Sequence, residues 1–367
     1  MKQFALLVAI LSVAVSCGTK TLSGDQIIGA IFDGADELGM QIIVETNVTG
    51  GGLFEEGADL DTLVCRQKEW MRSFHAAFGD HPSFAGWYFG NEINPVDTLD
   101  VAKSLFWRTL WGESSKTAKE LDPDDVTTIS PFFILDKDEW RGFRYFQPEE
   151  YRVWWAASLL AGGIDILMLQ DSGAEHQAFF TLEERRPFLE AFADACHQAG
   201  SQFWVNVETG QVRAEDWPDA VAQERERRRN WEFTPIDFLA QKLDLAAQYA
   251  TGTINWGYYP LMTPTDGAAV SLKDIDGQKA IDLSTRKENY EAYKAYAEKV
   301  PQEPAKGQLI RPLLGGTLWW LPGGIDTLPR KEALSALRSE LECMHEVGID
   351  IVILGALPKY FSNQTVE

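Results

Sequence analysis

The sequence has 367 residues, of which 45% are hydrophobic and 12% aromatic, and its formal net charge is -22. This length and hydrophobic content suffice for a buried core in one large domain or two medium ones, and they exclude a disordered chain. The acidic balance argues against a nucleic-acid partner, because binding to phosphate backbones requires a basic face.

The first 17 residues have the pattern of an export signal. Lys2 supplies a positive start, and the apolar run from Phe4 to Val15 is too short to span a bilayer. Small residues followed by Cys17 resemble the cleavage site of bacterial lipoproteins. We therefore expect residues 1–17 to be a signal peptide and the protein to be exported, to the cell envelope, the periplasm or the medium. Lipidation of Cys17 would attach it to a membrane.

Eight short apolar runs follow, separated by stretches that can hold amphipathic helices. The predicted strands are Gln41–Thr46, Phe84–Glu92, Val126–Phe133, Ile164–Asp171, Phe203–Glu208, Thr253–Tyr259, Gly316–Trp320 and Ile349–Gly355. Strands that are apolar on both faces and alternate with helices are typical of a parallel sheet covered by helices.

Eight β/α units predict a closed (β/α)8 barrel, the TIM barrel, as a single domain over residues 24–359. The alternative is an open, doubly wound sheet. That fold favours a glycine-rich phosphate-binding turn after an early strand, and the sequence has no GxGxxG. The five histidines form no HxH or HExxH pattern, and the cysteines lack metal-ligand spacing. We therefore predict neither a metal site nor a cofactor.

Polar residues cluster where the predicted strands end, which is where a (β/α)8 barrel builds its active site. Glu92 ends the second run and Glu208 ends the fifth. A pair of carboxyl groups, one protonating the leaving oxygen and one attacking carbon or activating water, is what cleavage of a glycosidic bond requires. Amides that bind hydroxyls and aromatic rings that stack on sugars accompany them. The candidate substrate-binding residues are Asn91, Gln170, Asp171, Asn206, Trp256, Tyr258 and Trp320.

Each of these residues also has a purely structural interpretation. Asn91 and Glu92 could begin a helix, as an N-cap and a favourable first-turn acid. Glu208 could be a solvated strand end, Asp171 a turn former, and the aromatic residues core. The interpretation as a site depends on two glutamates together, at the ends of strands three units apart.

Several blocks resemble a bacterial family known as domain of unknown function 4434, a group proposed to be glycosyl hydrolases with a TIM-barrel fold. The blocks are FAGWYFGNEI, ISPFF, WWAASLLAGGIDILMLQDSGA, FWVNVETG and LAQKLDLAAQYATGTINW, in the family's order. Gly90 and Asn91 depart from the family, which often has proline two residues before this glutamate. The pair Asn91–Glu92 instead resembles the clan A glycosidases, which place an acid/base glutamate after asparagine on strand four and a nucleophilic glutamate on strand seven.

The resemblance implies an unusual order of units. If Phe84–Glu92 is the fourth strand, residues 24–300 hold the second helix and units three to eight. Residues 310–359 then resemble the family's first strand, first helix and second strand. The sequence therefore looks circularly permuted, which exposed loops tolerate. A truncated tandem protein or a fault in gene assembly would give the same order.

The resemblance implies an exported glycoside hydrolase that acts with retention on an oligosaccharide or polysaccharide, with Glu92 as acid/base and Glu208 as nucleophile. Two alternatives remain. One is a non-catalytic, carbohydrate-binding barrel on the cell surface, and the other is a different hydrolase or lyase on the same scaffold. The sugar, the linkage and the oligomeric state are not predicted.

Overall fold

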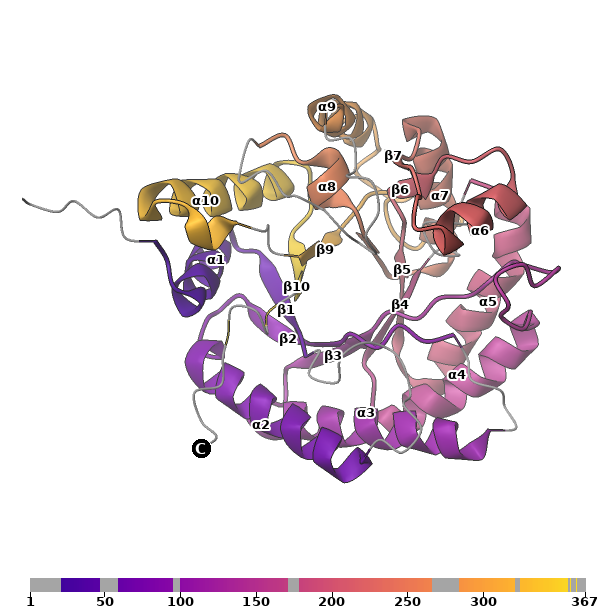
Figure 1. Ribbon diagram of the computed structural model, residues 1–367, viewed down its shortest axis with the longest axis horizontal. Coiled ribbons are helices and arrows are strands. Elements are labelled where there is room, and N and C mark those ends of the chain that lie inside the picture. The colour runs from indigo at the N-terminus through magenta and orange to yellow at the C-terminus, as the bar shows by residue number, and fades with distance from the viewer. Residues whose placement is uncertain are drawn as a thin grey trace, which may run out of the picture.

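A computed structural model describes residues 21–46, 59–94, 100–170, 178–265, 284–320 and 324–355, together with positions 357 and 361. Eight parallel strands close into a barrel in the order β1-β10-β9-β8-β5-β4-β3-β2. Figure 1 shows helices around this barrel. The predicted (β/α)8 barrel is confirmed.

All eight predicted strands are present. Their bounds are β1 Gln41–Glu45, β2 Phe84–Phe89, β3 Val126–Ile129, β4 Ile166–Gln170, β5 Gln202–Asn206, β8 Gly252–Asn255, β9 Gly316–Trp320 and β10 Ile351–Gly355. β9 pairs with β8 on one side and β10 on the other, and β10 pairs with β1 from Gln41↔Ile351 to Val44↔Leu354. The last two strands of the chain thus close the sheet, as predicted.

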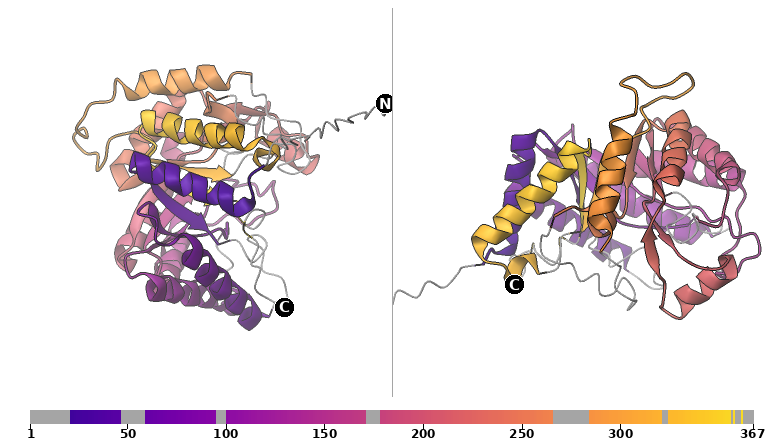
Figure 2. Two further views of the ribbon diagram at one scale, coloured as in Figure 1. Left: turned by 90° about the vertical axis from the view of Figure 1, so that its left-hand side faces the viewer. Right: turned by 90° about the horizontal axis from the view of Figure 1, so that it is seen from above.

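Helices surround the barrel in the described part of the chain. The longer ones are α1 Gly24–Leu38, α2 Leu60–Phe78, α3 Val101–Leu121, α4 Pro148–Gly162, α5 Leu182–Ala199, α7 Ile236–Tyr249, α9 Arg286–Ala297 and α10 Arg330–Glu346. Shorter elements are α6 Trp217–Arg225, α8 Tyr258–Met262 and the 3-10 turn Ile325–Thr327. Figure 2 shows α1 and α10 side by side on one flank.

Local sequence explains where these helices begin and end. Thr181 and Glu184 form a capping box at the start of α5, and Gly200 ends the helix in the left-handed conformation. Ser23 and Gln26 form the capping box at the start of α1. Because each side chain satisfies a backbone N–H that the first helical turn leaves unpaired, the boundaries follow from the sequence.

Strand periodicity separates two cores. Alternate residues of each strand point to opposite faces. Ile42 and Val44 face the helices, whereas Ile43 faces the barrel interior. The interior layer consists of Ile43, Tyr88, Ile166, Met168, Ile254, Leu318 and Ile353. This layer fills the barrel, so a ligand has room only above it, at the strand ends.

A β-bulge sets the direction of the side chains in β2. The register with β1 shifts between Ile42 and Ile43. Gly86 lies at the shift with φ +145°, and a Cβ atom there would lie 2.1 Å from the carbonyl oxygen of Val126. Only glycine permits this close approach of two backbones. Beyond the bulge, Tyr88 points into the barrel.

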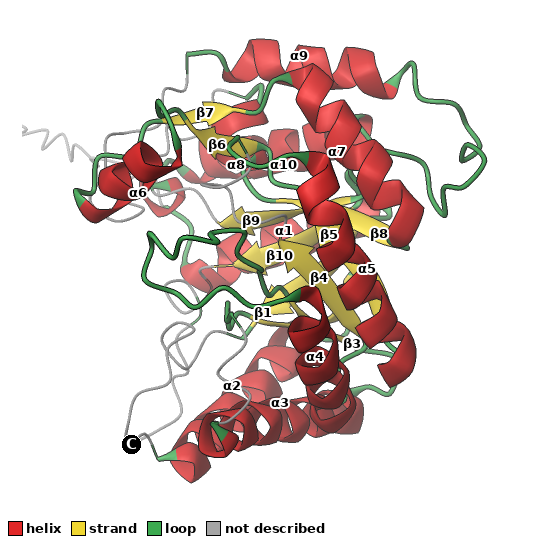
Figure 3. Ribbon diagram, turned by 90° about the vertical axis from the view of Figure 1, so that its right-hand side faces the viewer, coloured by secondary structure: helices red, strands yellow, loops and turns green. Residues whose placement is uncertain are grey.

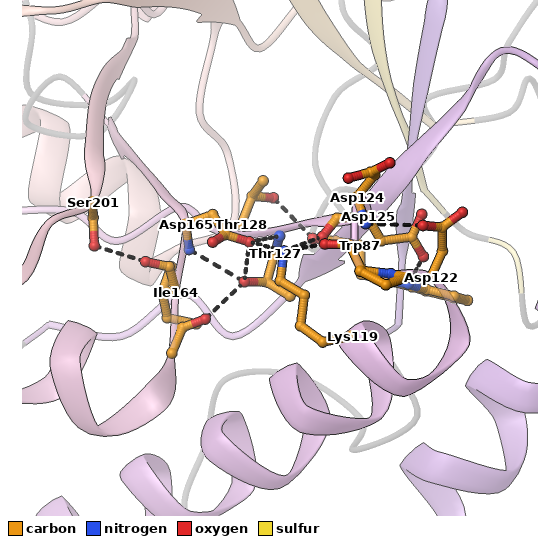
Figure 4. A network of polar contacts seen from close by, with 12 residues as sticks. Trp87, Lys119, Asp122, Asp124, Asp125, Thr127, Thr128, Ile164, Asp165 and Ser201 are labelled. Atoms are coloured by element: carbon orange, nitrogen blue, oxygen red, sulfur yellow. Dashed lines mark hydrogen bonds and ion pairs between the residues drawn. The ribbon is translucent and has the colours of Figure 1, made fainter.

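The N-terminal ends of the strands are held by a polar network (Figure 4). Asp125 accepts a hydrogen bond from Trp87 Nε1 at 2.8 Å. Asp165 accepts from the backbone N–H of Thr127 at 2.9 Å and pairs with Lys119 at 3.0 Å. These residues lie at the opposite end from the strand tips, where barrel residues serve stability.

A small hairpin and α6 lie on the side towards which β9 and β10 point (Figure 3). The hairpin strands, β6 Gly210–Val212 and β7 Trp231–Phe233, are antiparallel. Trp217 of α6 donates from Nε1 to Asp136 at 2.9 Å, and Arg141 pairs with Glu224 at 2.7 Å. The loop after β3 and the segment after β5 are therefore joined above the barrel.

The ring of strands does not test the predicted permutation. Any cut of a closed barrel leaves the strands in the same cyclic order. Circular permutation thus stays a prediction. The predicted signal peptide, which includes Cys17, lies outside the described residues, and no helix within the described ranges is long and apolar enough to cross a membrane.

Candidate active site

The barrel mouth, meaning the C-terminal ends of the eight strands, collects polar and aromatic side chains by strand periodicity. Each lies two residues beyond an interior residue, so it points inward at the next level up. Glu45 follows Ile43, Gln170 follows Met168, and Trp320 follows Leu318. Asn206, on β5, and Trp256, just after the end of β8, take equivalent positions two residues beyond Trp204 and Ile254.

Glu208 is held on a rigid extension of β5. The N–H of Val207 donates to the carbonyl of Ile254 at 2.8 Å, which continues the strand pairing. The buried ammonium of Lys242, on α7, donates to the main-chain oxygen of Glu208 at 2.6 Å. Thr209 is fixed in turn, because its hydroxyl donates to the carbonyl of Trp256 at 2.6 Å. The Glu208 side chain is 3% exposed, so this carboxylate is positioned by its backbone.

Glu92 lies on a turn, since β2 ends at Phe89. The N–H of Asn91 donates back to the carbonyl of Phe89 at 2.7 Å. The amide oxygen of Asn91 accepts from Trp111 Nε1, on α3, at 3.1 Å, and the side chain is 4% exposed. Asn91 thus anchors the turn to the helix layer. Glu92 is exposed.

Tyr88 lies among three carboxylates. Burial raises the pKa of its phenol well above the usual value. Negative charges add to this rise in the pKa, in decreasing order those of Glu92, Glu45 and Glu208, whereas a side-chain hydrogen bond with Ser130 opposes it. The charges of three carboxylates, one each from the ends of β1, β2 and β5, thus act on one buried hydroxyl.

Tryptophans form an aromatic wall beside the carboxylates. The rings of Trp256 and Trp320 meet edge to face with centroids 6.1 Å apart. Trp231, on β7, lies 5.2 Å from Trp256. Trp256 is 9% exposed and Trp320 is half-buried, so Trp320 offers more ring surface to a ligand. Trp231 was not predicted, because a strand of three residues leaves no periodic signal.

Gln170 and Asn206 lie side by side in the floor of the mouth. They are partners in the register of β4 and β5. Gln170 donates from Nε2 to the carbonyl of Ser130 at 2.9 Å, and both side chains are largely buried. They therefore form part of the buried floor of the mouth. Asp171, also predicted as a substrate-binding residue, lies outside the described residues.

Tyr258 is not in the mouth. β8 ends at Asn255, and Gly257, with φ +95°, turns the chain into α8. The Tyr258 ring is fully buried in the core outside the barrel, where the charge of Glu340, on α10, acts on its phenol. Its assignment to a substrate subsite is wrong, because the alternation that would point it inward stops three residues earlier.

In the described part of the chain, no group of three or more His, Cys, Asp or Glu residues is arranged to hold a metal ion.

The fold and the mouth define a TIM barrel whose strand ends carry carboxylates, amides and tryptophans. The chain belongs to the family described as domain of unknown function DUF4434, whose model matches residues 12–268. The predicted family membership is confirmed. The match ends before β9 and β10, which complete the barrel. No curated protein sequence matches the chain.

Several solved structures are similar to this chain at low identity. A proposed alpha-L-fucosidase from Bacteroides thetaiotaomicron is 15% identical, with a TM-score of 0.48 over 75% of this chain and 87% of that one. The carboxyl transferase domain of Rhizobium etli pyruvate carboxylase is 12% identical, with a TM-score of 0.42 over 90% and 41%. A xylanase from Paenibacillus barcinonensis is 14% identical, with a TM-score of 0.37 over 81% and 75%.

Proposed function

We propose that this protein is an exported glycoside hydrolase acting with retention, with Glu208 as nucleophile and Glu92 as acid/base. The observation that carries the proposal is that β1, β2 and β5 each have a glutamate at or just beyond their C-terminal ends, on the same face of the barrel as the paired rings of Trp256 and Trp320. β2 and β5 lie three strands apart in the ring of eight. Strands in this relation lie on facing sides of the barrel, so side chains at their ends can meet over the mouth.

The two glutamates have environments suited to different roles. The nucleophile must stay fixed while the anomeric carbon approaches, and Glu208 is buried on a backbone held by Lys242. The acid/base must reach both a leaving oxygen and water, and Glu92 is exposed on a turn. A sugar bound over the mouth would cover Glu92 and supply the burial that favours its protonated form.

The chemical steps follow from these roles. Glu92 donates its proton to the glycosidic oxygen as the Glu208 carboxylate attacks the anomeric carbon, and the alcohol leaves. Glu92 then removes a proton from water, which attacks the glycosyl–enzyme ester and releases Glu208. The sugar keeps its configuration because two inversions occur.

Glu208→Gln tests the proposal. On a panel of aryl glycosides and polysaccharides, we expect turnover to fall by about 10³-fold or more, because the amide cannot act as the nucleophile. Thermal unfolding should be unchanged. Glu303→Gln, at an exposed position, is the matched control. NMR of the first sugar released should show the substrate's anomeric configuration.

Two outcomes would reject the proposal. Binding of sugars without turnover would identify a carbohydrate-binding barrel instead. Release of the opposite anomer would make Glu208 a general base that activates water, and the mechanism an inverting one.

A further inference from the structure

Glu45 is a third mouth carboxylate, and the fold leaves a dedicated space for it. β1 lies between β2 and β10 in the barrel. Both neighbours present glycine at the level of Glu45: Gly90 follows β2, and Gly355 ends β10. A Cβ atom on Gly90 would lie 2.5 Å from Oε1 of Glu45, and one on Gly355 would lie 2.9 Å from Oε2. The carboxylate thus occupies space that two side chains would otherwise fill.

Two aromatic residues border the space that holds Glu45. Glu45 is 7% exposed and lies in register with Tyr88, on whose phenol its charge acts. The Trp320 indole borders the same space, with Nε1 2.8 Å from the Cβ position of Gly355. Thr46 holds the strand end behind it, because its N–H donates to the carbonyl of Tyr88 at 2.9 Å. The carboxylate therefore has a fixed position beside an aromatic face.

We propose that Glu45 is a substrate-binding residue that accepts hydrogen bonds from two hydroxyls of the reacting sugar, whose ring packs on Trp320. This inference rests on the proposed function, because it places the sugar at the carboxylates Glu92 and Glu208. Two carboxylate oxygens match a pair of neighbouring hydroxyls, each of which donates one hydrogen.

The same geometry selects the substrate class. A sugar with its own carboxylate at this position would meet the charges of Glu45, Glu92 and Glu208 at close range, and like charges repel strongly where water is excluded. The site therefore takes neutral sugars with a free vicinal diol and rejects uronic acids at the reacting position.

Three variants separate substrate binding from a structural role. Glu45→Gln keeps the shape and removes the charge. Gly90→Ala displaces the carboxylate, since the three atoms nearest to its Cβ position all belong to Glu45. Gly29→Ala, whose Cβ would have only Phe78 nearby, at 4.0 Å, is the control. The probes are p-nitrophenyl glycosides of neutral hexoses, their 2- and 3-deoxy analogues, and p-nitrophenyl glucuronide.

We expect Glu45→Gln to raise KM for the neutral glycosides by about 10- to 100-fold, because charged hydrogen bonds to the sugar are lost. The ratio of kcat/KM for neutral glycosides to kcat/KM for the glucuronide should fall. Gly90→Ala should change KM in the same direction at unchanged Tm, and Gly29→Ala should change nothing. A deoxy analogue that lacks a hydroxyl bound by Glu45 should bind the natural chain more weakly than the parent sugar does. The two sugars should bind equally well to Glu45→Gln.

A binding assay distinguishes failure of this inference from failure of the proposed function. Free neutral monosaccharides are titrated into Glu208→Gln, with and without Glu45→Gln, and tryptophan fluorescence is followed. Sugar binding that depends on Glu45 supports the inference even if no glycoside is cleaved. Cleavage with a KM indifferent to Glu45, or a preference for the glucuronide, overturns it. A chain that neither binds nor cleaves these sugars overturns both.

Discussion

At the scale of single residues, the glutamates of the mouth differ in how they are held. Glu208 is buried on a strand extension, and Glu45 lies over two glycines, whereas Glu92 is exposed on a turn. Exposure leaves the Glu92 carboxyl accessible to both the leaving group and water. Its role as proton donor can be separated from the nucleophilic role by varying the leaving group.

Replacing Glu92 with Gln should lower kcat/KM most for substrates with poor leaving groups. We expect a loss of about 10²–10⁴-fold on phenyl glycosides, because their oxygen needs the proton. On 2,4-dinitrophenyl glycosides, whose phenolate leaves unaided, the loss should be much smaller. Steady-state kinetics on both series test this. Equal losses on both would contradict the role, and Glu303→Gln should affect neither.

A second residue-scale prediction concerns Glu340, which is buried on α10. Burial is the main cause that raises the pKa of this carboxyl to about 7, and the hydroxyl of Thr263, which donates to it at 2.8 Å, opposes the rise. The pKa of Asp125 is likewise raised, to about 6, chiefly by burial. A raised acid pKa means that the folded state binds more protons than the unfolded one. Stability from these groups is therefore greatest below their ordinary pKa values and falls as pH rises through 6 and 7.

The variant Glu340→Gln should remove part of this pH dependence. We expect it to stabilise the protein by about 1–3 kcal/mol at pH 8 and hardly at all at pH 4.5, since the neutral amide has no charge to desolvate. Urea unfolding at several pH values measures it. Glu342→Gln, on an exposed residue of the same helix, should leave the pH profile unchanged. An unchanged slope in Glu340→Gln would refute the prediction.

At the scale of elements, the sequence predicted the strands well and their ends poorly. Each apolar run became a strand because a barrel strand is buried on both faces. The ends depend on tertiary structure: Gly257 turns the chain away before Tyr258, and the backbone bond from Asn91 to Phe89 ends β2 early. No local pattern reveals either.

The site shows the same division. Strand periodicity sufficed to place Gln170, Trp256 and Trp320 at the mouth. It could not single out Glu45 from the other strand ends, because the space that holds it is made by Gly90 and Gly355, more than 260 positions apart in the chain. Side chains at strand ends are predictable from sequence, but the neighbours that give them a role are not.

An element-scale prediction concerns the β-bulge at Gly86. Gly86→Ala should destabilise the protein by about 2–4 kcal/mol, because a Cβ would collide with the backbone of Val126 and φ +145° is strained for any other residue. Urea unfolding measures the loss. Gly29→Ala, in an open helical position, should not destabilise. A fully stable Gly86→Ala chain would mean that β2 can pair without the bulge.

At the scale of the whole molecule, export remains a proposal. Mass spectrometry of protein extracted from membranes should find residues 1–16 removed and a lipid on Cys17. An intact Met1 would refute export, and an N-terminal but unmodified Cys17 would refute lipidation alone. Cys17→Ser should shift the protein from the membrane to the soluble fraction, because the diacyl anchor depends on this thiol.

The predicted permutation has a consequence for the whole barrel. If β9, α10 and β10 form the first units of the family order, a chain beginning with them should fold equally well. Such a chain runs from residue 308 to 367 and continues from 18 to 300, so it opens the exposed stretch 301–307 and joins the present ends. All strand pairs are kept, and the cost of closing a different loop is only about 1 kcal/mol. We expect a cooperative unfolding transition within a few degrees of that of the natural chain and the same substrate profile, measured by thermal unfolding and kinetics.

A control chain opened inside α4, between Trp154 and Trp155, should not fold, because the opening splits a buried helix. If the rearranged chain failed like this control, the present order would be required for folding, and permutation would lose its support.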